Sequence, residues 1–230
     1  GEDLPEPAVV AGHDALVTKV DYASSPLFGP AGPRKQDVDQ GSVGDCYFLA
    51  RLGSVASSDP EYIRNSVAPL GDGSYVVRFW DDKAPHKPVY VRVDADLWTR
   101  TSTGRPIYAG VLANGGSWVA IMEKAYAVAR KGQLSYASIA GGNGTKLVHF
   151  VNGVAGAPQE SFTGDNGTLT PEKVRNWWAN GEPAGATADL VEAQNDTLLN
   201  WVDARLAEGK AVGFGSMGNL TDSLDLTADN

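Results

Sequence analysis

The segment QGSVGDCYFLARL, residues 40–52, most constrains the fold of this chain because it changes from loop to helix at a cysteine. Its glycines, Gly41 and Gly44, permit a tight backbone path before the change. The residues that follow are apolar at helical spacing: Leu49, Leu52, Val55 and Ala56. We therefore predict a helix that begins at Cys46 and ends near Pro60, which disfavours its continuation.

Cys46 is the only cysteine of the chain, which excludes an internal disulfide and a zinc site of several thiolates. It lies on the first turn of the predicted helix, where Asp45 can act as the cap. Free N–H groups and the helix dipole favour a thiolate there, whereas the charge of Asp45 opposes it. Because free cysteines are often buried, two interpretations stay open, a nucleophile and an inert core residue.

Gln40 lies six residues before this cysteine and carries a side-chain N–H. Together with the backbone N–H of Cys46, it could bind the oxyanion that forms when a thiolate attacks a peptide carbonyl. Two donors and one nucleophile make half of an acyl-transfer site.

The composition is that of a globular protein, with 42% hydrophobic and 20% charged residues among 230. A net charge of −9 and the lack of a Lys/Arg cluster argue against nucleic acid as a partner. We find neither a membrane span nor a signal sequence, so we expect no membrane partner and favour a soluble, cytoplasmic protein, with secretion left open. His13, His86 and His149 are too far apart in sequence to indicate a local metal site.

Periodicity predicts further elements on both sides of the midpoint of the chain. Residues 75–80 and 89–94 alternate as two strands of a hairpin, and residues 118–127 form a buried helix. A flexible corner follows at residues 141–144. In the tail we expect a helix from Thr170-Pro171, a helix over 198–206 that Gly209 closes, and a strand over 211–215.

The segment around Cys46 resembles the nucleophile signature of calpain-like cysteine proteases, Gln-Gly-x-x-Gly-Asp-Cys-aromatic-Phe/Leu-Leu-Ala. The matching positions are Gln40, Gly41, Gly44, Asp45, Cys46, Leu49 and Ala50, and Tyr47 stands where the family usually has tryptophan. Three later segments, 91–94, 118–127 and 136–142, are similar to the family in the same order. Papain-type proteases share the Gln-to-Cys spacing, but they usually have a second cysteine in this loop.

This resemblance implies an α+β fold of the papain-like, calpain-type kind in three regions. Residues 1–25 would be an N-terminal arm, residues 26–147 a mainly helical lobe that bears the cysteine, and residues 148–230 the first, incomplete part of a β-rich His/Asn lobe. It also implies roles for Cys46 as the nucleophile and Gln40 as the oxyanion donor.

The resemblance further assigns the backbone of Gly142 as a hydrogen-bonding edge for substrate. A simple helix-ending turn is the alternative for this glycine. In calcium-dependent members, an acidic residue before the motif and a glutamate ahead of the second helix help to bind calcium. Asp37 fits the first position, but Gly116 falls at the second. We therefore expect no required cofactor and leave calcium open, with Gly116 arguing against calcium control through this lobe.

The family also needs a histidine in a Gly-His strand and an orienting asparagine, and neither motif occurs up to Asn230. We interpret His149 as structural. We expect an endopeptidase for protein or peptide substrates, whose histidine and asparagine come from a C-terminal remainder, either continuous or as a separate cleaved chain. The alternatives are an inactive calpain-like module that binds peptides or partners, and a redox-sensing cysteine, for which no resolving cysteine exists.

Overall fold

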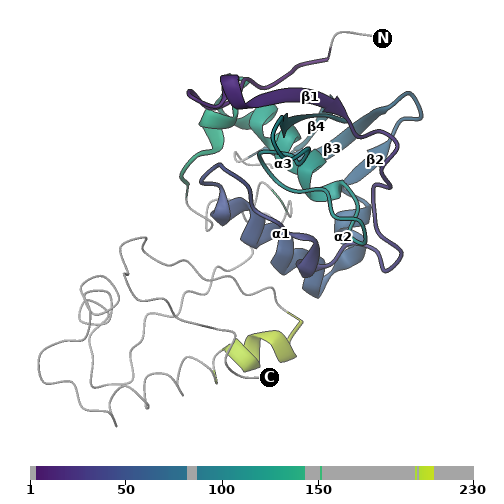
Figure 1. Ribbon diagram of the computed structural model, residues 1–230. Helices are drawn as coiled ribbons and strands as arrows, with labels where there is room; N and C mark the ends of the chain where they lie inside the picture. The colour runs from purple at the N-terminus through teal and green to yellow at the C-terminus, as the bar shows by residue number, and fades with distance from the viewer. Residues whose placement is uncertain (1–3, 82–86, 143–150, 152–199, 201, 210–230) are drawn as a thin grey trace, which may run out of the picture. The chain divides into compact units, whose positions relative to one another are not determined.

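The chain divides into two compact units, residues 1–157 and residues 158–230, of which the computed structural model describes mainly the first (Figure 1). The described residues are 4–81, 87–142, 151, 200 and 202–209. Several expected features lie outside them: His86, His149, the corner beyond Gly142, the helix from Thr170 and the strand over 211–215.

A three-stranded antiparallel sheet contains the expected hairpin. Its strands are β2 (Val67–Pro69), β3 (Ser74–Trp80) and β4 (Pro88–Asp94), in that order. The register places Val77 opposite Val91, and both side chains are buried. Alternate residues of the hairpin therefore form one apolar face, as the period of two predicts.

A second, two-stranded sheet joins the N-terminal region to the middle of the chain. Strand β1 (Val17–Asp21) pairs antiparallel with β5 (Asp96–Arg100), which follows β4 after a single residue. Because four of the five residues of β1 are exposed, no apolar alternation marks this strand in the sequence. Helices and strands are mixed in the described part of this unit.

The two expected helices of this unit are confirmed. They are α1 (Cys46–Ser58) and α3 (Trp118–Ala129). After α1 the chain starts a short α2 (Pro60–Arg64), whose first turn is capped by the Asp59 side chain, which accepts the Tyr62 N–H at 3.1 Å. Short 3₁₀ turns complete the unit: η1 (Asp14–Leu16), η2 (Lys35–Asp37), η3 (Arg130–Gly132) and η4 (Tyr136–Ile139).

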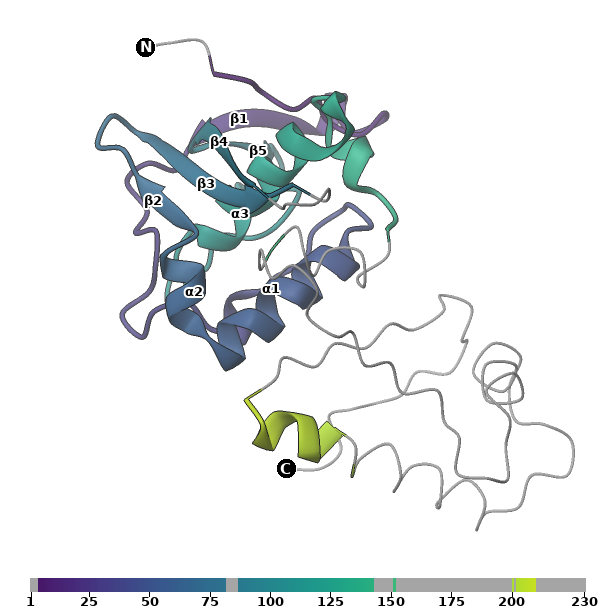
Figure 2. The same ribbon diagram turned by 180° about the vertical axis from the view of Figure 1, so that it is seen from behind.

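Helix α3 lies at the centre of the core, because every residue from Trp118 to Ala127 is buried. It contacts β3 and β4 as well as α1, and both views show it between the strands and α1 (Figures 1 and 2). Three aromatic rings join these elements. Phe48 of α1 stacks on Tyr126 of α3 with centroids 4.2 Å apart, and Phe79 of β3 lies 6.2 Å from Tyr126. Burial of each such side chain stabilises the fold by about 1.5–3 kcal/mol.

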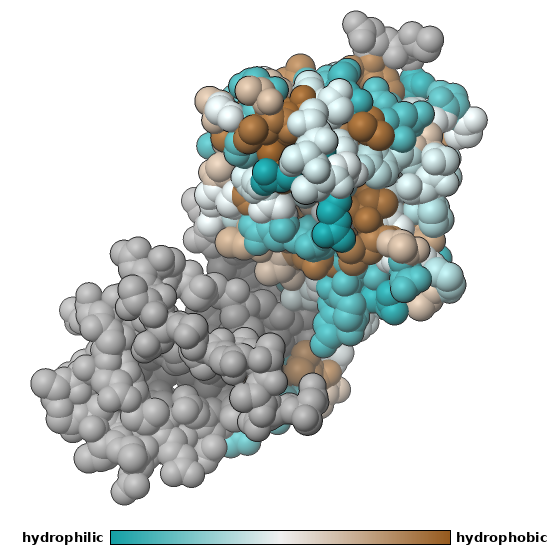
Figure 3. Space-filling view, viewed as in Figure 1, coloured by the Kyte–Doolittle hydropathy of each residue, from teal (hydrophilic) through white to brown (hydrophobic). Residues whose placement is uncertain are grey.

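In the second unit, residues 200 and 202–207 are helical. Gly209 has a φ of 70°, and its N–H donates to the Leu206 carbonyl at 2.9 Å, so this glycine ends the helix as predicted. None of the helices in the described part of the chain has the length and apolar character needed to cross a membrane. On the face shown in Figure 3, the hydrophobic residues of the described part form small groups separated by hydrophilic ones.

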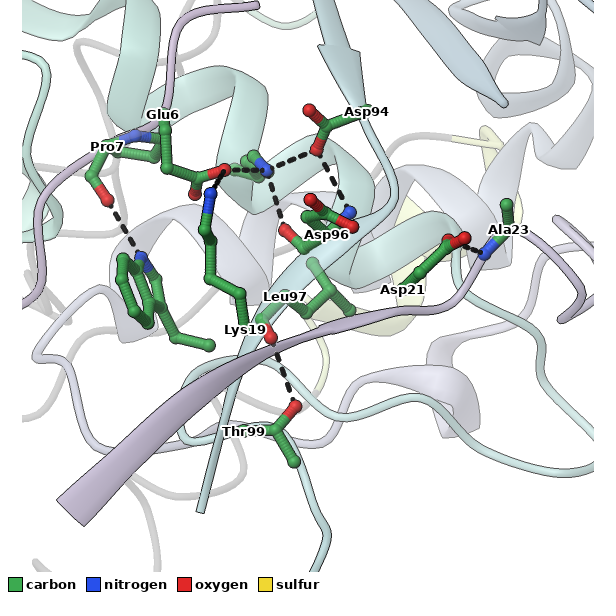
Figure 4. A network of polar contacts seen from close by, with 11 residues as sticks. Glu6, Pro7, Lys19, Asp21, Ala23, Asp94, Asp96, Leu97 and Thr99 are labelled. Atoms are coloured by element: carbon green, nitrogen blue, oxygen red, sulfur yellow. Dashed lines mark hydrogen bonds and ion pairs between the residues drawn. The ribbon is translucent and has the colours of Figure 1, made fainter. Parts of the chain in front are cut away.

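A buried lysine fastens the N-terminal region to the core (Figure 4). The Lys124 side chain of α3 is 0% exposed. Its ammonium donates to Glu6 Oε2 at 2.8 Å, Asp94 Oδ1 at 2.7 Å and the Asp96 carbonyl at 2.6 Å. Next to Glu6, the Pro7 carbonyl accepts the indole N–H of Trp98 at 3.0 Å. Glu6 and Pro7 are thus part of the folded unit.

We expect Lys124→Met to lower the free energy of unfolding by about 3 kcal/mol, because it leaves two neighbouring carboxylates without their shared cation. Lys19→Met is the matched control: Lys19 approaches the same Glu6 Oε2 at 4.0 Å but is 44% exposed. This control should cost less than about 1 kcal/mol. Urea unfolding of both variants measures the difference, and equal losses would contradict a structural role specific to Lys124.

Candidate active site around Cys46

The loop before α1 is shaped by a close backbone approach at Gly41. A Cβ atom there would lie 2.2 Å from the Tyr108 carbonyl oxygen and 2.4 Å from that of Ile107, so only glycine fits. The next residue, Ser42, donates its N–H to the Ile107 carbonyl at 2.7 Å. Gly44 is different, since the nearest atom to a Cβ there is 3.9 Å away. The prediction of a tight path is therefore confirmed at Gly41 and not at Gly44.

Cys46 is the first residue of α1, and its side chain is exposed. The structure thus excludes the interpretation of an inert core cysteine. The apolar face of the same helix turns inward at Phe48 and Leu49, which are 0% and 1% exposed. Solvent and a substrate can both reach a thiol in this position, which nucleophilic chemistry requires.

The Gln40 amide lies across the loop that leads to Cys46. Its Nε2 donates to the carbonyl of buried Val43 at 2.9 Å. A side-chain amide has two N–H groups, so this bond orients the amide and leaves one donor for another acceptor. Gln40 also lines a cavity of about 330 Å³ together with Arg100 and Arg105. The oxyanion role of Gln40 stays a prediction.

The Gly-Gly corner is fixed against the cysteine loop. The Gly141 N–H donates to the Gly44 carbonyl at 2.8 Å, which joins two segments almost a hundred residues apart. Gly142 lies against the ring of Tyr47, since a Cβ at Gly142 would come within 2.3 Å of that ring. The close approach explains why a glycine is needed here. Its proposed role as an edge for substrate stays a prediction.

Tyr47 and Arg130 hold this corner in place. The Tyr47 hydroxyl donates to the Ile139 carbonyl at 2.8 Å and also contacts the Arg130 guanidinium. That guanidinium lies 5.3 Å from the Tyr47 ring centroid and donates to the Gly141 carbonyl at 3.0 Å. Burial raises the pKa of Tyr47, so its hydroxyl stays neutral and remains a donor. Tyr47 was marked in the sequence by its place in the family signature, whereas Arg130 was missed because its only signal is a charge after an apolar helix.

Asp45 does not cap α1 as expected. Its side chain makes no capping hydrogen bond and is 0% exposed. It turns inward to Glu123 of α3, which is 1% exposed. Burial raises the pKa of both carboxyls, to about 6 for Asp45 and well above the ordinary value for Glu123. Glu123 was also missed, although an acid inside an apolar helix signals a specific partner.

The residues at the position of the family's calcium loop do not fit a calcium ion. Both carboxylate oxygens of Asp37 already accept protein donors: Arg34 through its N–H at 2.8 Å and its guanidinium at 3.1 Å, and the Trp118 indole at 3.0 Å. Gly116 offers no side-chain oxygen. Among the described residues, no group of three or more His, Cys, Asp or Glu side chains could hold a metal ion.

Of the three histidines, only His13 lies among the described residues. His13 lies 3.5 Å from the Tyr108 hydroxyl through its Nδ1 atom and precedes the η1 turn. This contact agrees with a structural role for His13. Among the described residues, His13 belongs to no group of three or more side chains that could hold a metal ion.

Comparison with known proteins tests the resemblance. The pattern of the calpain family cysteine proteases matches residues 18–207. The calpain-type cysteine protease ADL1 of Oryza sativa subsp. japonica is 32% identical over 137 residues, 55% of this chain and 6% of that protein. The calpain-1 catalytic subunit of Rattus norvegicus is 29% identical over 212 residues, 89% of this chain and 24% of that protein. The calpain-2 catalytic subunit of Gallus gallus is 29% identical over 143 residues, 59% of this chain and 19% of that protein.

Because the family pattern covers most of the chain, this chain is classed with the cysteine proteases, which are also called thiol proteases and are hydrolases. More narrowly, the chain belongs to the calpain family. The resemblance to calpain-like proteases that the sequence indicated is thereby confirmed. The chain matches 6% of the length of the rice relative and 24% of that of the rat relative.

We expect Gly142→Ala to lower the free energy of unfolding by about 1–3 kcal/mol, because the new methyl group overlaps the Tyr47 ring. Gly44→Ala is the matched control, since a Cβ at Gly44 meets no atom closer than 3.9 Å. Thermal unfolding of both variants gives the comparison. A stable Gly142→Ala variant would show that the corner does not depend on this contact.

Proposed function

We propose that this chain is the nucleophile-bearing part of a calpain-like cysteine endopeptidase that hydrolyses protein or peptide substrates. The proposal extends the family assignment from class to activity. It also includes a papain-like arrangement of the protease core, with a general-base histidine and an orienting asparagine supplied by sequence after Asn230.

One observation carries the proposal: Cys46 is exposed at the start of α1 while the residues around it are held from several sides. The Gln40 amide is oriented by Val43, and the Gly141 corner is bonded to Gly44. A cysteine without a chemical role needs neither an exposed side chain nor neighbouring residues held in fixed positions. A nucleophile needs both, because the reacting atoms must be reachable and must keep their geometry.

The proposed mechanism starts with attack of the Cys46 thiolate on the carbonyl carbon of a peptide bond. The tetrahedral oxyanion is stabilised by the Cys46 backbone N–H and by the Gln40 N–H that does not donate to Val43. The peptide C–N bond breaks, the amine leaves with a proton, and Cys46 is acylated. Water then hydrolyses the thioester and regenerates the thiol. The histidine would act first as base, then as acid.

The backbone beside Gly142 is proposed to bind the substrate main chain. Gly142 is exposed, whereas the neighbouring Gly141 already uses both its N–H and its carbonyl, to Gly44 and Arg130. Main-chain groups at Gly142 that make no hydrogen bond to another described residue would pair with a peptide in a strand-like manner, which suits substrates of varied sequence.

Cys46→Ala should abolish cleavage of an unfolded protein substrate by the complete protein, with its unfolding midpoint unchanged because Cys46 is exposed. Fluorescence of a quenched substrate measures cleavage, and anisotropy of a labelled peptide measures binding. Full cleavage by Cys46→Ala would reject the assignment. Peptide binding without cleavage by the unmodified protein would instead support the inactive binding module.

Gln40→Ala should reduce kcat by roughly 10²–10³, the loss typical of an oxyanion donor, with a smaller change in KM. Gln36→Ala is the matched control, since Gln36 is an exposed glutamine in η2. Its kinetics should equal those of the unmodified protein. An unchanged kcat for Gln40→Ala would remove this residue from the site.

A further inference from the structure

Two carboxyl groups face each other in the core directly beneath the nucleophile. Asp45 precedes Cys46 in the chain, and Glu123 lies in the middle of α3. Their side chains are 0% and 1% exposed. The proposed mechanism uses neither of them, so their burial so close to the reacting thiol needs its own explanation.

The hydrogen bonds of this pair are incomplete without a proton. Glu123 Oε2 accepts the Ala109 N–H at 2.8 Å. Glu123 Oε1 and both Asp45 oxygens receive no donor from another described residue, although the two carboxyls lie within hydrogen-bonding range of each other. Two ionised carboxylates offer only acceptors, so a bond between them requires that one holds a proton.

The surroundings favour keeping that proton. Besides the adjacent Cys46 thiol, the described titratable groups that interact with the pair are four tyrosines: Tyr47 on α1, Tyr126 on α3, Tyr136 on η4 and Tyr108 in the segment before α3. Burial raises the pKa of each hydroxyl, so all four are neutral at ordinary pH. No Lys, Arg or His among the described residues shifts the pKa of either carboxyl. Within this described part, no cation offsets a second negative charge on the pair.

The backbone of Asp45 connects this pair to the nucleophile. The Asp45 carbonyl accepts the N–H of Phe48 at 2.7 Å and of Leu49 at 3.2 Å, which forms the first turn of α1. Cys46 lies inside that turn. A displacement of Asp45 would therefore move the cysteine and its N–H.

We propose that Asp45 and Glu123 share one proton and that this acid–carboxylate pair positions Cys46 by holding the first turn of α1 against α3. When the proton leaves to water or hydroxide, two buried negative charges repel each other, and Asp45 moves toward solvent together with Cys46. Asp45 and Glu123 are thus positioning residues for the thiol. The inference deepens the proposed function. Only the catalytic role of the pair rests on that function, whereas the shared proton and its effect on Cys46 do not.

The direction of the pH effect on stability follows from the same pair. Burial raises the pKa of Asp45 to about 6 and that of Glu123 well above its ordinary value, so the folded state binds more protons than the unfolded chain. The contribution is fully present below the unfolded pKa values near 4 and is lost as the pH rises through the folded ones. The urea midpoint should accordingly fall from about pH 4 upward, and less steeply in Asp45→Asn and Glu123→Gln.

The test follows the alkylation rate of the single cysteine by iodoacetamide, with mass spectrometry of the full chain from about pH 5 to about pH 9. Asp45→Asn and Glu123→Gln keep the shape of the carboxyls, but their amides donate at every pH. Loss of the proton displaces the first turn of α1 in the unmodified protein, so its thiolate loses the helix-start N–H groups that favour it and its rate falls behind that of the variants. We expect the ratio of variant to unmodified rate to rise by roughly threefold or more across this range for both variants.

The opposite trend would overturn the proposal. If Asp45 acted only through its charge, its removal would raise the thiolate fraction most at low pH, and the ratio would fall toward one as the thiol ionises. A flat ratio would overturn it as well. The double variant Asp45→Asn/Glu123→Gln should match the singles, because its two amides can pair with each other. Glu61→Gln is the control, since Glu61 has 72% side-chain exposure, and its ratio should stay at one.

This readout needs no protease activity. A rising ratio in a protein that fails to cleave substrate would support the positioning pair and reject the proposed function. Cleavage of substrate together with a flat or falling ratio would support the proposed function and reject the positioning pair.

Discussion

The first unit depends on the burial of Glu123 and Lys124, an acid and a base that are adjacent on the otherwise apolar helix α3. Charged side chains without water must find partners, because leaving them unpaired in the core costs several kcal/mol. Successive residues of a helix point about 100° apart, so the two find their partners in different directions. Lys124 binds Glu6 and the carboxylate that ends β4. Glu123 meets the turn that begins α1.

The same helix therefore links the N-terminal region to the segment that bears Cys46. On one side it fixes the chain before β1, and on another it supports Asp45 and the aromatic stack of Phe48 on Tyr126. Cys46 itself remains exposed. An exposed thiol on a buried scaffold suits a member of the calpain family, since reactive groups keep their geometry best when rigid elements hold the residues around them.

Much of this arrangement could be predicted where the signal is local. The helix at Cys46, the buried helix at Trp118 and the hairpin follow from periods of 3.6 and 2, which reflect which face of an element meets the core. Strand β1 could not be predicted, because its exposed residues carry no such pattern. The Asp45 cap was wrong because a local rule for helix starts competes with a partner that is distant in sequence.

The sequence by itself determined the family and the position of Cys46 at a helix start, since these depend on residue types at fixed short spacings. Only the tertiary structure decided that Cys46 is exposed, that the Gln40 amide is held by Val43, and that Asp45 is buried against Glu123. The reason is physical: exposure and pairing depend on which distant segments fold together, and no local spacing encodes a contact between α1 and α3.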